Sequence, residues 1–267
     1  MINKKVGFLG CGNMGGAIAQ RIALNNSFVV HVSDKDKAKA TAFADSHGAK
    51  TAETAEICKE CGFIFLAVKP QVMPSLLKEI SPILDDRQDS CCIVSMAAGW
   101  SIEKLSGYIG NGFPVIRIMP NTPTAVGEGM IVYSFNAASE KYEQVFREMM
   151  RTCGIIEHVD ESKIDAVTSI SGCGPAYVYM FINAMADAGV SLGLTRSLAQ
   201  ELAAQTLLGS AKMIQTSDKH PMTLKDEVCS PGGSTIQGVL ALENNGFNNA
   251  VEKAVIAGYE KTVKLGK

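Results

Sequence analysis

The sequence lacks a hydrophobic segment long enough to span a membrane. Its longest wholly apolar run, FIFLAV at residues 63–68, is far shorter than the roughly 20 residues that a membrane helix requires. The first residues, MINKK, lead directly into VGFLG without the apolar stretch and cleavage site of a secretory signal. We therefore expect a cytoplasmic protein that has no membrane contact.

Strong charge of one sign is also absent. Lys and Arg number 25 and Asp and Glu number 27, so the formal net charge is −2. Because nucleic acid and anionic membranes attract basic surfaces, the composition predicts neither as a partner. No internal repeat or low-complexity segment interrupts the 267 residues, a length that suits two domains.

The eight cysteines do not suggest disulfides or a metal site. Most lie inside apolar segments, where cysteine behaves as a small buried hydrophobe. Cys58 and Cys61 form a CxxC pair, but no second pair or histidine follows at the spacing of zinc ligands. We expect no bound metal.

What the first 160 residues do contain is an alternation of short β-branched runs with longer mixed segments such as 13–24 and 35–47. This alternation is typical of βαβ units, and it predicts a doubly wound parallel α/β sheet with both faces covered. The predicted strands are VGFLG (6–10), FVVHV (28–32), FIFLAV (63–68), CCIVSM (91–96), PVIRIM (114–119), MIVYSF (130–135) and IIEHV (155–159).

After Asp160 the strand pattern stops and long helices are predicted at 174–190 and 195–214. The first is apolar almost all round, and the second is rich in Ala, Gly and Ser. An all-helical piece of roughly one hundred residues cannot bury both helices alone, so we predict that a second subunit covers them. The charged segment DESKID marks the expected boundary between domains 1–160 and 161–267.

The segment GFLGCGNMGGAI predicts a dinucleotide-binding loop. Gly10, Gly12 and Gly15 stand in GxGxxG register between a predicted strand and a predicted helix. Glycines at these positions permit the tight turn, the approach of backbone to a pyrophosphate and close packing of helix on strand. The motif alone is a weak indication, but its place between a predicted strand and a predicted helix makes it a strong one.

Asp34 follows Gly15 at about the 20-residue spacing of the acidic residue that binds a ribose in such folds. A carboxylate there favours NAD(H), whereas Lys35 and Lys37 favour a 2′-phosphate. The alternative interpretation of DKDK is a solvated helix start. We therefore expect NADP(H) or NAD(H) and leave the preference open.

Two further loops, AVKP (67–70) and MPNTP (119–123), are predicted to follow strands at the edge where doubly wound sheets bind ligands. Lys69 is either a general acid or a contact for phosphate or a backbone carbonyl. A second pattern typical of anion binding is VCSPGGSTI (228–236), in which proline, two glycines and two hydroxyls precede a helix-like run.

Taken in order, GFLGCGNMG, FLAVKP, SMAAGW, MPNTP, SGCGPAYVYMF, GSAKM, HPMTLKDEVCSPGGSTI and LENNGF resemble the pyrroline-5-carboxylate reductase family over essentially the whole chain. The resemblance implies an N-terminal Rossmann domain and an all-α C-terminal dimerisation domain, in a 6-phosphogluconate dehydrogenase-like arrangement. It also implies reduction of 1-pyrroline-5-carboxylate to L-proline in the last step of proline biosynthesis. Active sites would lie at subunit interfaces of a homodimer, with assemblies up to a decamer.

The resemblance also implies which residues bind the ligands. The cofactor positions are Leu9, Gly10, Cys11, Gly12, Asn13, Met14, Asp34, Thr54, Ala67, Val68, Lys69, Pro70, Met96, Ala97, Ala98 and Asn121. The substrate positions are Asp218, Val228, Ser230, Gly233, Ser234 and Thr235, so the second loop would hold the substrate carboxylate. Some relatives carry a neutral or basic residue at the position of Asp34. At the position of Glu227, relatives can carry an amide.

Thr235 is our candidate catalytic residue, because its hydroxyl can hydrogen-bond the ring nitrogen and relay a proton from water to it. His220 is the strongest histidine candidate, but a residue before proline at a helix boundary typically stabilises the loop. We interpret His31, His47 and His158 as structural.

Two rival functions stay open at this point. A β-hydroxyacid dehydrogenase would resemble its relatives in having a lysine on the first long helix after the sheet domain, and residues 171–189 contain none. A sensor that binds NAD(P) without chemistry would leave the SPGGST loop without a purpose.

Overall fold

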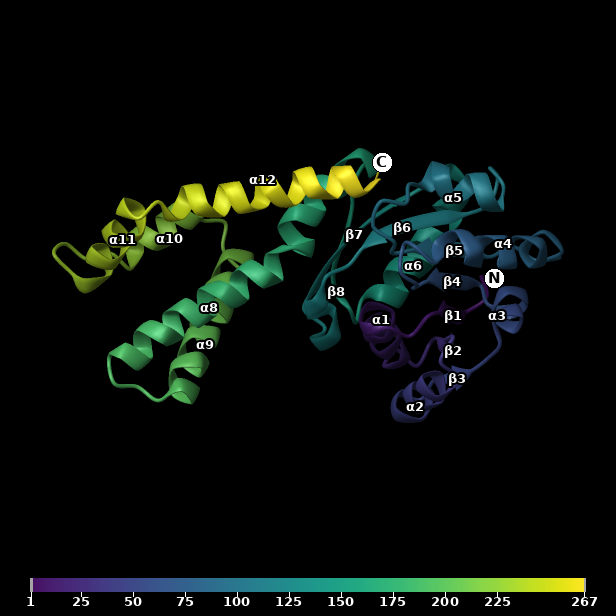
Figure 1. Cartoon of the computed structure of the whole chain (residues 1–267), viewed down its shortest axis with the longest axis horizontal. Coiled ribbons are helices and arrows are strands. Elements are labelled where there is room, and N and C mark those ends of the chain that lie inside the picture. The colour runs from purple at the N-terminus through teal and green to yellow at the C-terminus, as the bar shows by residue number, and fades with distance from the viewer. Residues whose placement is uncertain (1, 267) are drawn as a thin grey trace. The chain divides into compact units, whose positions relative to one another are not determined.

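The computed structural model describes residues 2–266, which divide into two compact units (Figure 1). The first unit extends through Cys173 and includes the segment from Gly258 onward, and the second unit is Gly174–Ala257. The predicted domain limits, 1–160 and 161–267, stay a prediction.

The first unit is built on an eight-stranded sheet with the order β3-β2-β1-β4-β5-β6-β7-β8 (Figure 1). Every predicted run forms a strand, and β1 to β6 pair in parallel. The two-residue β3 carries no β-branched run that predicts it. The strands are β1 (Lys5–Leu9), β2 (Val29–Ser33), β3 (Lys50–Thr51), β4 (Phe63–Leu66), β5 (Cys92–Ser95), β6 (Val115–Met119), β7 (Gly129–Phe135) and β8 (Gly154–His158).

The predicted parallel sheet has one antiparallel pair, near one edge. Strand β7 runs antiparallel to β6, and β8 then runs parallel to β7. Only residues 120–128, with the 3-10 helix Thr122–Val126, connect β6 to β7. A parallel crossover needs about a dozen residues or more, so this short connection forces the chain to reverse direction.

Helices cover both faces of the sheet, as the buried strands require. Phe63 and Phe65 of β4 lie in a core that side chains of α1, α2 and α6 complete. Ile64 and Leu66 lie in the opposite core, with side chains of α3, α4 and α5. These helices are α1 (Asn13–Ala23), α2 (Lys37–His47), α3 (Thr54–Glu60), α4 (Met73–Asp85), α5 (Ile102–Ile109) and α6 (Glu143–Met150).

A buried arginine fastens the segment that follows the sheet. Arg117 on β6 forms ion pairs with Glu161 at 3.0 Å and with Asp165 at 3.6 Å. The same Glu161 carboxylate accepts a hydrogen bond from the N–H of Ile102. This network anchors the short helix α7 (Ile164–Val167) and the adjoining π-helix Thr168–Gly172.

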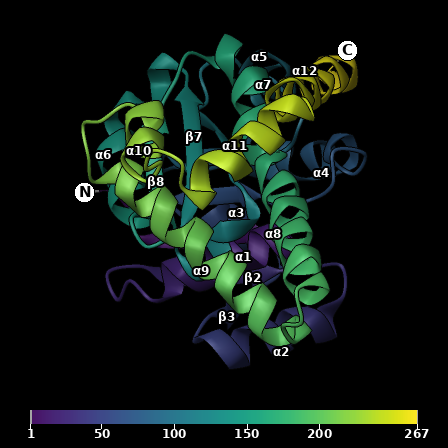
Figure 2. The same cartoon turned by 90° about the vertical axis from the view of Figure 1, so that its left-hand side faces the viewer.

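The second unit is entirely helical, as predicted for the chain after residue 160. Its first two helices lie side by side in both views (Figures 1 and 2), and a Cβ on Gly189 would come within 2.9 Å of the Cβ of Ala199. The helices are α8 (Gly174–Ser191), α9 (Arg196–Gln215), α10 (Pro221–Glu227), α11 (Ser234–Asn244) and α12 (Phe247–Gly266), the last of which continues beyond this unit.

The second unit has almost no core of its own. Across Gly174–Ala257 only Ala186, Ala199 and Ala203 are buried, whereas Met180 is 72% exposed and Leu208 is 60% exposed. Burying one large apolar side chain is worth about 1.5–3 kcal/mol. Helices that leave many such side chains uncovered fit the predicted association with a second subunit.

All eight cysteines carry free thiols. Six are buried, in agreement with their predicted role as small apolar side chains, and Cys173 and Cys229 are half-buried. Within residues 2–266 no three His, Cys, Asp or Glu side chains gather as a metal site would require. None of the described helices combines the length and apolar character needed to cross a membrane.

The exposed apolar helices generate a prediction about assembly. At micromolar concentration, light scattering should give at least twice the mass of one chain. Leu202 on α9 is half exposed, and its replacement by Glu should shift the protein toward monomer because a charge resists burial. Leu24 is equally apolar and exposed but lies in the first unit, so L24E is the control and should leave the mass unchanged. A native chain that stays monomeric contradicts the prediction.

The buried His31 on strand β2 predicts how the stability of the protein changes with pH. His31 is buried, and desolvation together with the charge of Lys5 lowers its pKa below the ordinary 6.5. Between its folded pKa and about 6.5 the unfolded chain binds more protons at this residue, so stability falls as pH decreases through that window. Histidine titrates between about pH 5 and pH 7. As pH decreases through this range, the midpoint of urea unfolding of H31L should fall less steeply than that of the native protein.

His158 is exposed, so H158Q is the control variant. Its urea midpoint should change with pH as that of the native protein does. Equal slopes for the native protein and H31L would show that His31 does not carry this pH dependence.

Candidate functional site

The predicted cofactor residues of the first unit gather at one edge of the sheet. Because β1, β2, β4, β5 and β6 are parallel, their carboxyl ends share an edge, and ligands of doubly wound sheets bind there. The 9–14 segment begins at the last residue of β1. The other predicted positions follow the strand ends, with Asp34 after β2, 67–70 after β4, 96–98 after β5 and Asn121 after β6. Thr54 begins α3, and its Oγ1 lies 3.3 Å from Oγ of Ser33 at the end of β2.

Close packing explains two of the three glycines in the first loop. Gly10 has φ +104°, and a Cβ there would lie 2.6 Å from the carbonyl oxygen of Ala67. A Cβ on Gly15 would lie 2.6 Å from Cβ of Ala67 and 2.8 Å from the carbonyl oxygen of Gly10. Larger residues would therefore push the loop away from β4 and α1 away from the loop.

The third glycine leaves open space in front of a helix N-terminus. Gly12 is the N-cap of α1 and supplies no side-chain cap, and a Cβ on it would meet nothing within 4 Å. The N–H groups of the first turn have no intrahelical partner, and helix N-termini with such free donors bind phosphate groups. The loop therefore fits the pyrophosphate of a dinucleotide.

Asp34 is held in a fixed position against this loop. Its Oδ2 accepts hydrogen bonds from the N–H of Cys11 at 2.8 Å and from the Cys11 thiol at 3.3 Å, and its Oδ1 accepts one from the N–H of Asp36 at 3.1 Å. Burial opposes ionisation of Asp34, but these hydrogen bonds outweigh it and lower its pKa. The carboxylate is therefore ionised and is held against Cys11 in the loop that follows β1.

Cys11 supplies both hydrogen bonds that Oδ2 of Asp34 accepts. Burial, followed by its hydrogen bond to Asp34, raises the pKa of the thiol to about 11. A thiol with that pKa stays protonated at neutral pH and acts as a hydrogen-bond donor. Its role at the site is to hold Asp34.

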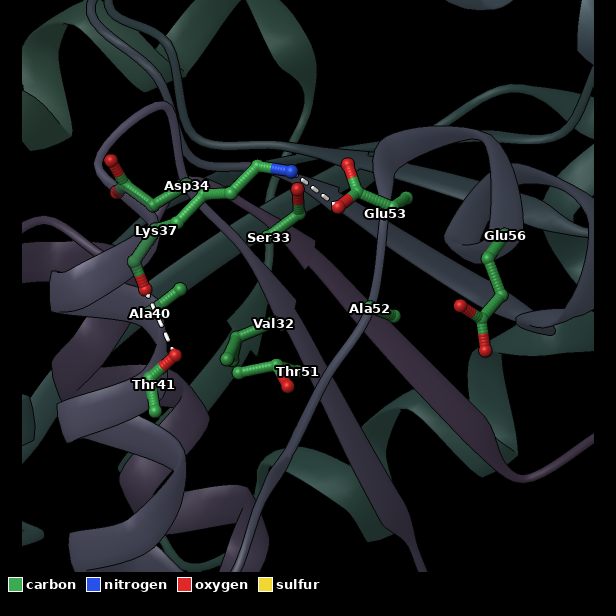
Figure 3. Close-up of a pocket in the computed structure, with 10 residues that line it drawn as sticks. All are labelled: Val32, Ser33, Asp34, Lys37, Ala40, Thr41, Thr51, Ala52, Glu53 and Glu56. Atoms are coloured by element: carbon green, nitrogen blue, oxygen red, sulfur yellow. Dashed lines mark hydrogen bonds and ion pairs between the residues drawn. The ribbon is translucent and has the colours of Figure 1, made fainter.

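A pocket opens beside Asp34, between α2 and the segment that joins β3 to α3 (Figure 3). Lys37 extends across it, and its ammonium pairs with Oε1 of Glu53 at 2.6 Å (Figure 3). The lining residues are Val32, Ser33, Asp34, Lys37, Ala40, Thr41, Thr51, Ala52, Glu53 and Glu56.

The sequence patterns did not predict Glu53, Glu56 and Thr41 as pocket residues. The only predicted cofactor positions near them in the sequence are Asp34 and Thr54. The solvated-start interpretation of DKDK holds in part, because Asp36 caps α2 by accepting from the N–H of Lys39.

Asn121 has structural partners on both sides of its amide. Its Nδ2 donates to the carbonyl oxygen of Ser171 at 3.0 Å, and its Oδ1 accepts from the N–H of Met130 at 2.9 Å. These bonds fix the loop after β6. A cofactor contact by Asn121 stays a prediction, as does the choice of role for Lys69.

The second predicted loop, in the helical unit, is a tight turn followed by a helix. The N–H of Gly233 donates to the carbonyl oxygen of Ser230 at 3.0 Å, with Pro231 and Gly232 between them and Gly232 at φ +71°. This is the pattern of a type II turn. A Cβ on Gly233 would lie only 2.4 Å from Oγ of Ser230, so a larger residue there would displace the Ser230 side chain.

Helix α11 begins directly behind this turn with free donors. Gly233 is its N-cap and supplies no side-chain cap, and Ser234 and Thr235 form its first exposed residues. The predicted substrate positions Ser230 to Thr235 are therefore together. Val228 lies exposed at the end of α10, and Asp218 lies in the segment between α9 and α10.

The histidines have structural surroundings. His220 is the N-cap of α10 and its Nδ1 accepts from the N–H of Met222 at 3.2 Å, which favours the interpretation that it stabilises the loop. His47 is stacked on Phe43, and the ring of His158 packs against Tyr133.

Two family models match the chain. Residues 161–265 match the model described as pyrroline-5-carboxylate reductase dimerisation. Residues 5–99 match the model described as NADP oxidoreductase, coenzyme F420-dependent. The first match and the uncovered apolar helices of the second unit together support homo-oligomerisation.

Full-length relatives and solved structures agree with these models. The chain is 42% identical to pyrroline-5-carboxylate reductase of Escherichia coli, with 100% of both chains covered. It is 38% identical to pyrroline-5-carboxylate reductase 3 of Xenopus laevis, covering 100% of this chain and 97% of the relative. A structure of pyrroline carboxylate reductase from Plasmodium falciparum with NADP bound has 36% identity and a TM-score of 0.87, with 100% of both chains covered.

The glycine loop generates a prediction about binding. G15A should destabilise the protein by roughly 1–3 kcal/mol because the new methyl group overlaps Ala67. It should also weaken binding of NAD⁺ or NADP⁺ by roughly tenfold or more, since the helix donors move away from the pyrophosphate. Urea unfolding and calorimetric titration measure the two effects.

Gly107 is a matched control on α5. It is exposed, and a Cβ on it would meet nothing within 4 Å. G107A should stabilise the helix by up to about 1 kcal/mol and leave binding unchanged. If G15A binds dinucleotide as the native protein does, the packing account of this loop is wrong.

Proposed function

Because the chain belongs to the pyrroline-5-carboxylate reductase family, we propose that it reduces the C=N bond of 1-pyrroline-5-carboxylate with NAD(P)H and forms L-proline. The full-length identity of 42% to a relative of that name carries the proposal. Two backbone sites support it, the open N-terminus of α1 for a pyrophosphate and the open N-terminus of α11 for a carboxylate.

The proposed division of labour follows the two family-model matches. Residues 1–160 bind the dinucleotide, and residues 161–267 provide the dimerisation surface and hold the substrate. The match of residues 161–265 supports the start of the second domain, and the match of residues 5–99 lies within the first. A homodimer is the proposed unit, and assembly of dimers up to a decamer is a further prediction that a mass measurement checks.

The dinucleotide is proposed to lie along the 9–14 loop, with its ribose at Asp34 and Thr54. The remaining contacts are proposed for residues 67–70 and 96–98. When bound, the nicotinamide supplies the hydride for the reduction. The chain's own part is to hold this group and the imine in one orientation.

The substrate carboxylate is proposed to bind at residues 230–235. A helix N-terminus alone contributes roughly 0.3–1 kcal/mol, whereas micromolar binding requires about 8 kcal/mol. Hydrogen bonds to a charged group contribute about 1.5–3 kcal/mol each. Several donors must therefore act together, and the N–H groups of Ser234 and Thr235 with the hydroxyls of Ser230 and Ser234 provide them.

Reduction of the imine also requires a proton at the ring nitrogen. Thr235 is proposed to accept or donate a hydrogen bond at that nitrogen and to relay a proton from water. A threonine hydroxyl is too weak an acid to ionise at neutral pH, so its role is positioning and relay. It passes a proton from water to a neutral imine, whereas a substrate that enters as the iminium ion already carries that proton and donates its N–H to the hydroxyl.

The two rival functions lose their support. Helix α8 carries no lysine, in contrast to what a β-hydroxyacid dehydrogenase would need. A sensor without chemistry would not account for the turn and open helix N-terminus at residues 230–235.

Substitution of Thr235 tests the mechanism. T235A should lower kcat for pyrroline-5-carboxylate by roughly tenfold or more, since a positioned proton relay typically contributes 10²–10⁴-fold. T235S keeps a hydroxyl and should recover most of the rate. The decrease of NADH or NADPH absorbance measures turnover.

Thr216, an exposed threonine at the end of α9, is the control, and T216A should turn over at the native rate. Full kcat and an unchanged KM in T235A would remove Thr235 from the mechanism. A native protein that oxidises neither NADH nor NADPH with this substrate would refute the proposed function itself.

A further inference from the structure

The pocket beside Asp34 bears on which of the two dinucleotides this chain selects. The family model that matches residues 5–99 is described as an NADP oxidoreductase, and the Plasmodium falciparum structure contains NADP. The choice between the two dinucleotides rests on the proposed dinucleotide binding by the first unit.

The hydrogen bonds of Asp34 leave room for one more donor. A carboxylate oxygen accepts about two hydrogen bonds. Oδ2 already accepts from the N–H and the thiol of Cys11, and Oδ1 accepts from the N–H of Asp36 only. The remaining position on Oδ1 suits a ribose hydroxyl, which can donate. A 2′-phosphate is anionic near neutral pH and would meet the carboxylate as a like charge.

The cation that lines the pocket is already paired. Lys37 forms its ion pair with Glu53 at 2.6 Å, and both side chains extend across the pocket (Figure 3). The lining residues thus carry three carboxylates, on Asp34, Glu53 and Glu56, against the one ammonium of Lys37. Glu53 therefore competes with a 2′-phosphate for Lys37, and this competition is weak because both side chains are largely exposed.

We propose that this chain selects the dinucleotide without a 2′-phosphate, that Asp34 is the main specificity-determining residue, and that Glu53 reinforces the selection by holding Lys37. Cys11 acts as a positioning residue because its N–H and thiol fix Oδ2 of Asp34. The chain thereby differs in its preferred dinucleotide from the relative whose structure has NADP bound.

Calorimetric titration with NAD⁺ and with NADP⁺ tests the proposal, since binding needs neither imine nor turnover. One hydrogen bond to a charged group corresponds to roughly 10- to 100-fold in affinity. The native protein should therefore bind NAD⁺ at least about tenfold more tightly than NADP⁺. ADP-ribose and its 2′-phosphate, which lack the nicotinamide, should give the same order and confine the effect to this pocket.

Variants separate the two contributions. D34S should reduce the ratio of the two dissociation constants by roughly tenfold or more. E53Q should reduce it by a smaller factor, mainly by tightening NADP⁺ binding, because Lys37 is released. Glu53 is largely exposed, so E53Q keeps the test valid if D34S does not fold.

Glu60 provides the matched control. It lies on the same helix α3, is about half exposed, and pairs with Lys5 at 2.7 Å, yet it does not line the pocket. E60Q should leave the ratio unchanged. Tighter binding of NADP⁺ than NAD⁺ by the native protein would overturn the proposal, and so would an unchanged ratio in both D34S and E53Q.

The outcomes distinguish this proposal from the proposed function. If NADPH is the better substrate for imine reduction and NADP⁺ binds more tightly, the specificity assignment fails and the reductase assignment stands. If NAD⁺ binds selectively and no imine reduction occurs with either dinucleotide, the specificity assignment stands and the reductase assignment fails.

Discussion

Free backbone N–H groups at two helix N-termini are the feature on which the account depends. Helices α1 and α11 each begin at a glycine that supplies no side-chain cap, so both leave donors without an intrahelical partner. The first faces open space at the carboxyl edge of a parallel sheet, and the second follows a type II turn. Each suits an anionic group, a pyrophosphate for the first and a carboxylate for the second.

The two units meet different physical requirements. The first has two dense cores on opposite faces of its sheet, which fix the strand ends and hence the loops that follow them. The second buries only alanines within Gly174–Ala257 and leaves large apolar side chains on its helices uncovered. These uncovered side chains and the match to a dimerisation family model support association with a second subunit.

Much of this could be predicted because it is local. The β-branched runs, the GxGxxG register and the SPGGST turn depend on residues close in sequence, and all formed as expected. The direction of β7 depended on the length of the 120–128 connection. The pocket beside Asp34 depended on pairs far apart in sequence, Cys11 with Asp34 and Lys37 with Glu53, which no single-segment pattern contains.

A crystal structure of the protein with proline and dinucleotide bound tests the central claim most directly. The account predicts the proline carboxylate within about 3 Å of the N–H groups of Ser234 and Thr235, and the pyrophosphate against the N-terminus of α1. A carboxylate bound elsewhere, with the N-terminus of α11 facing only water, would contradict it.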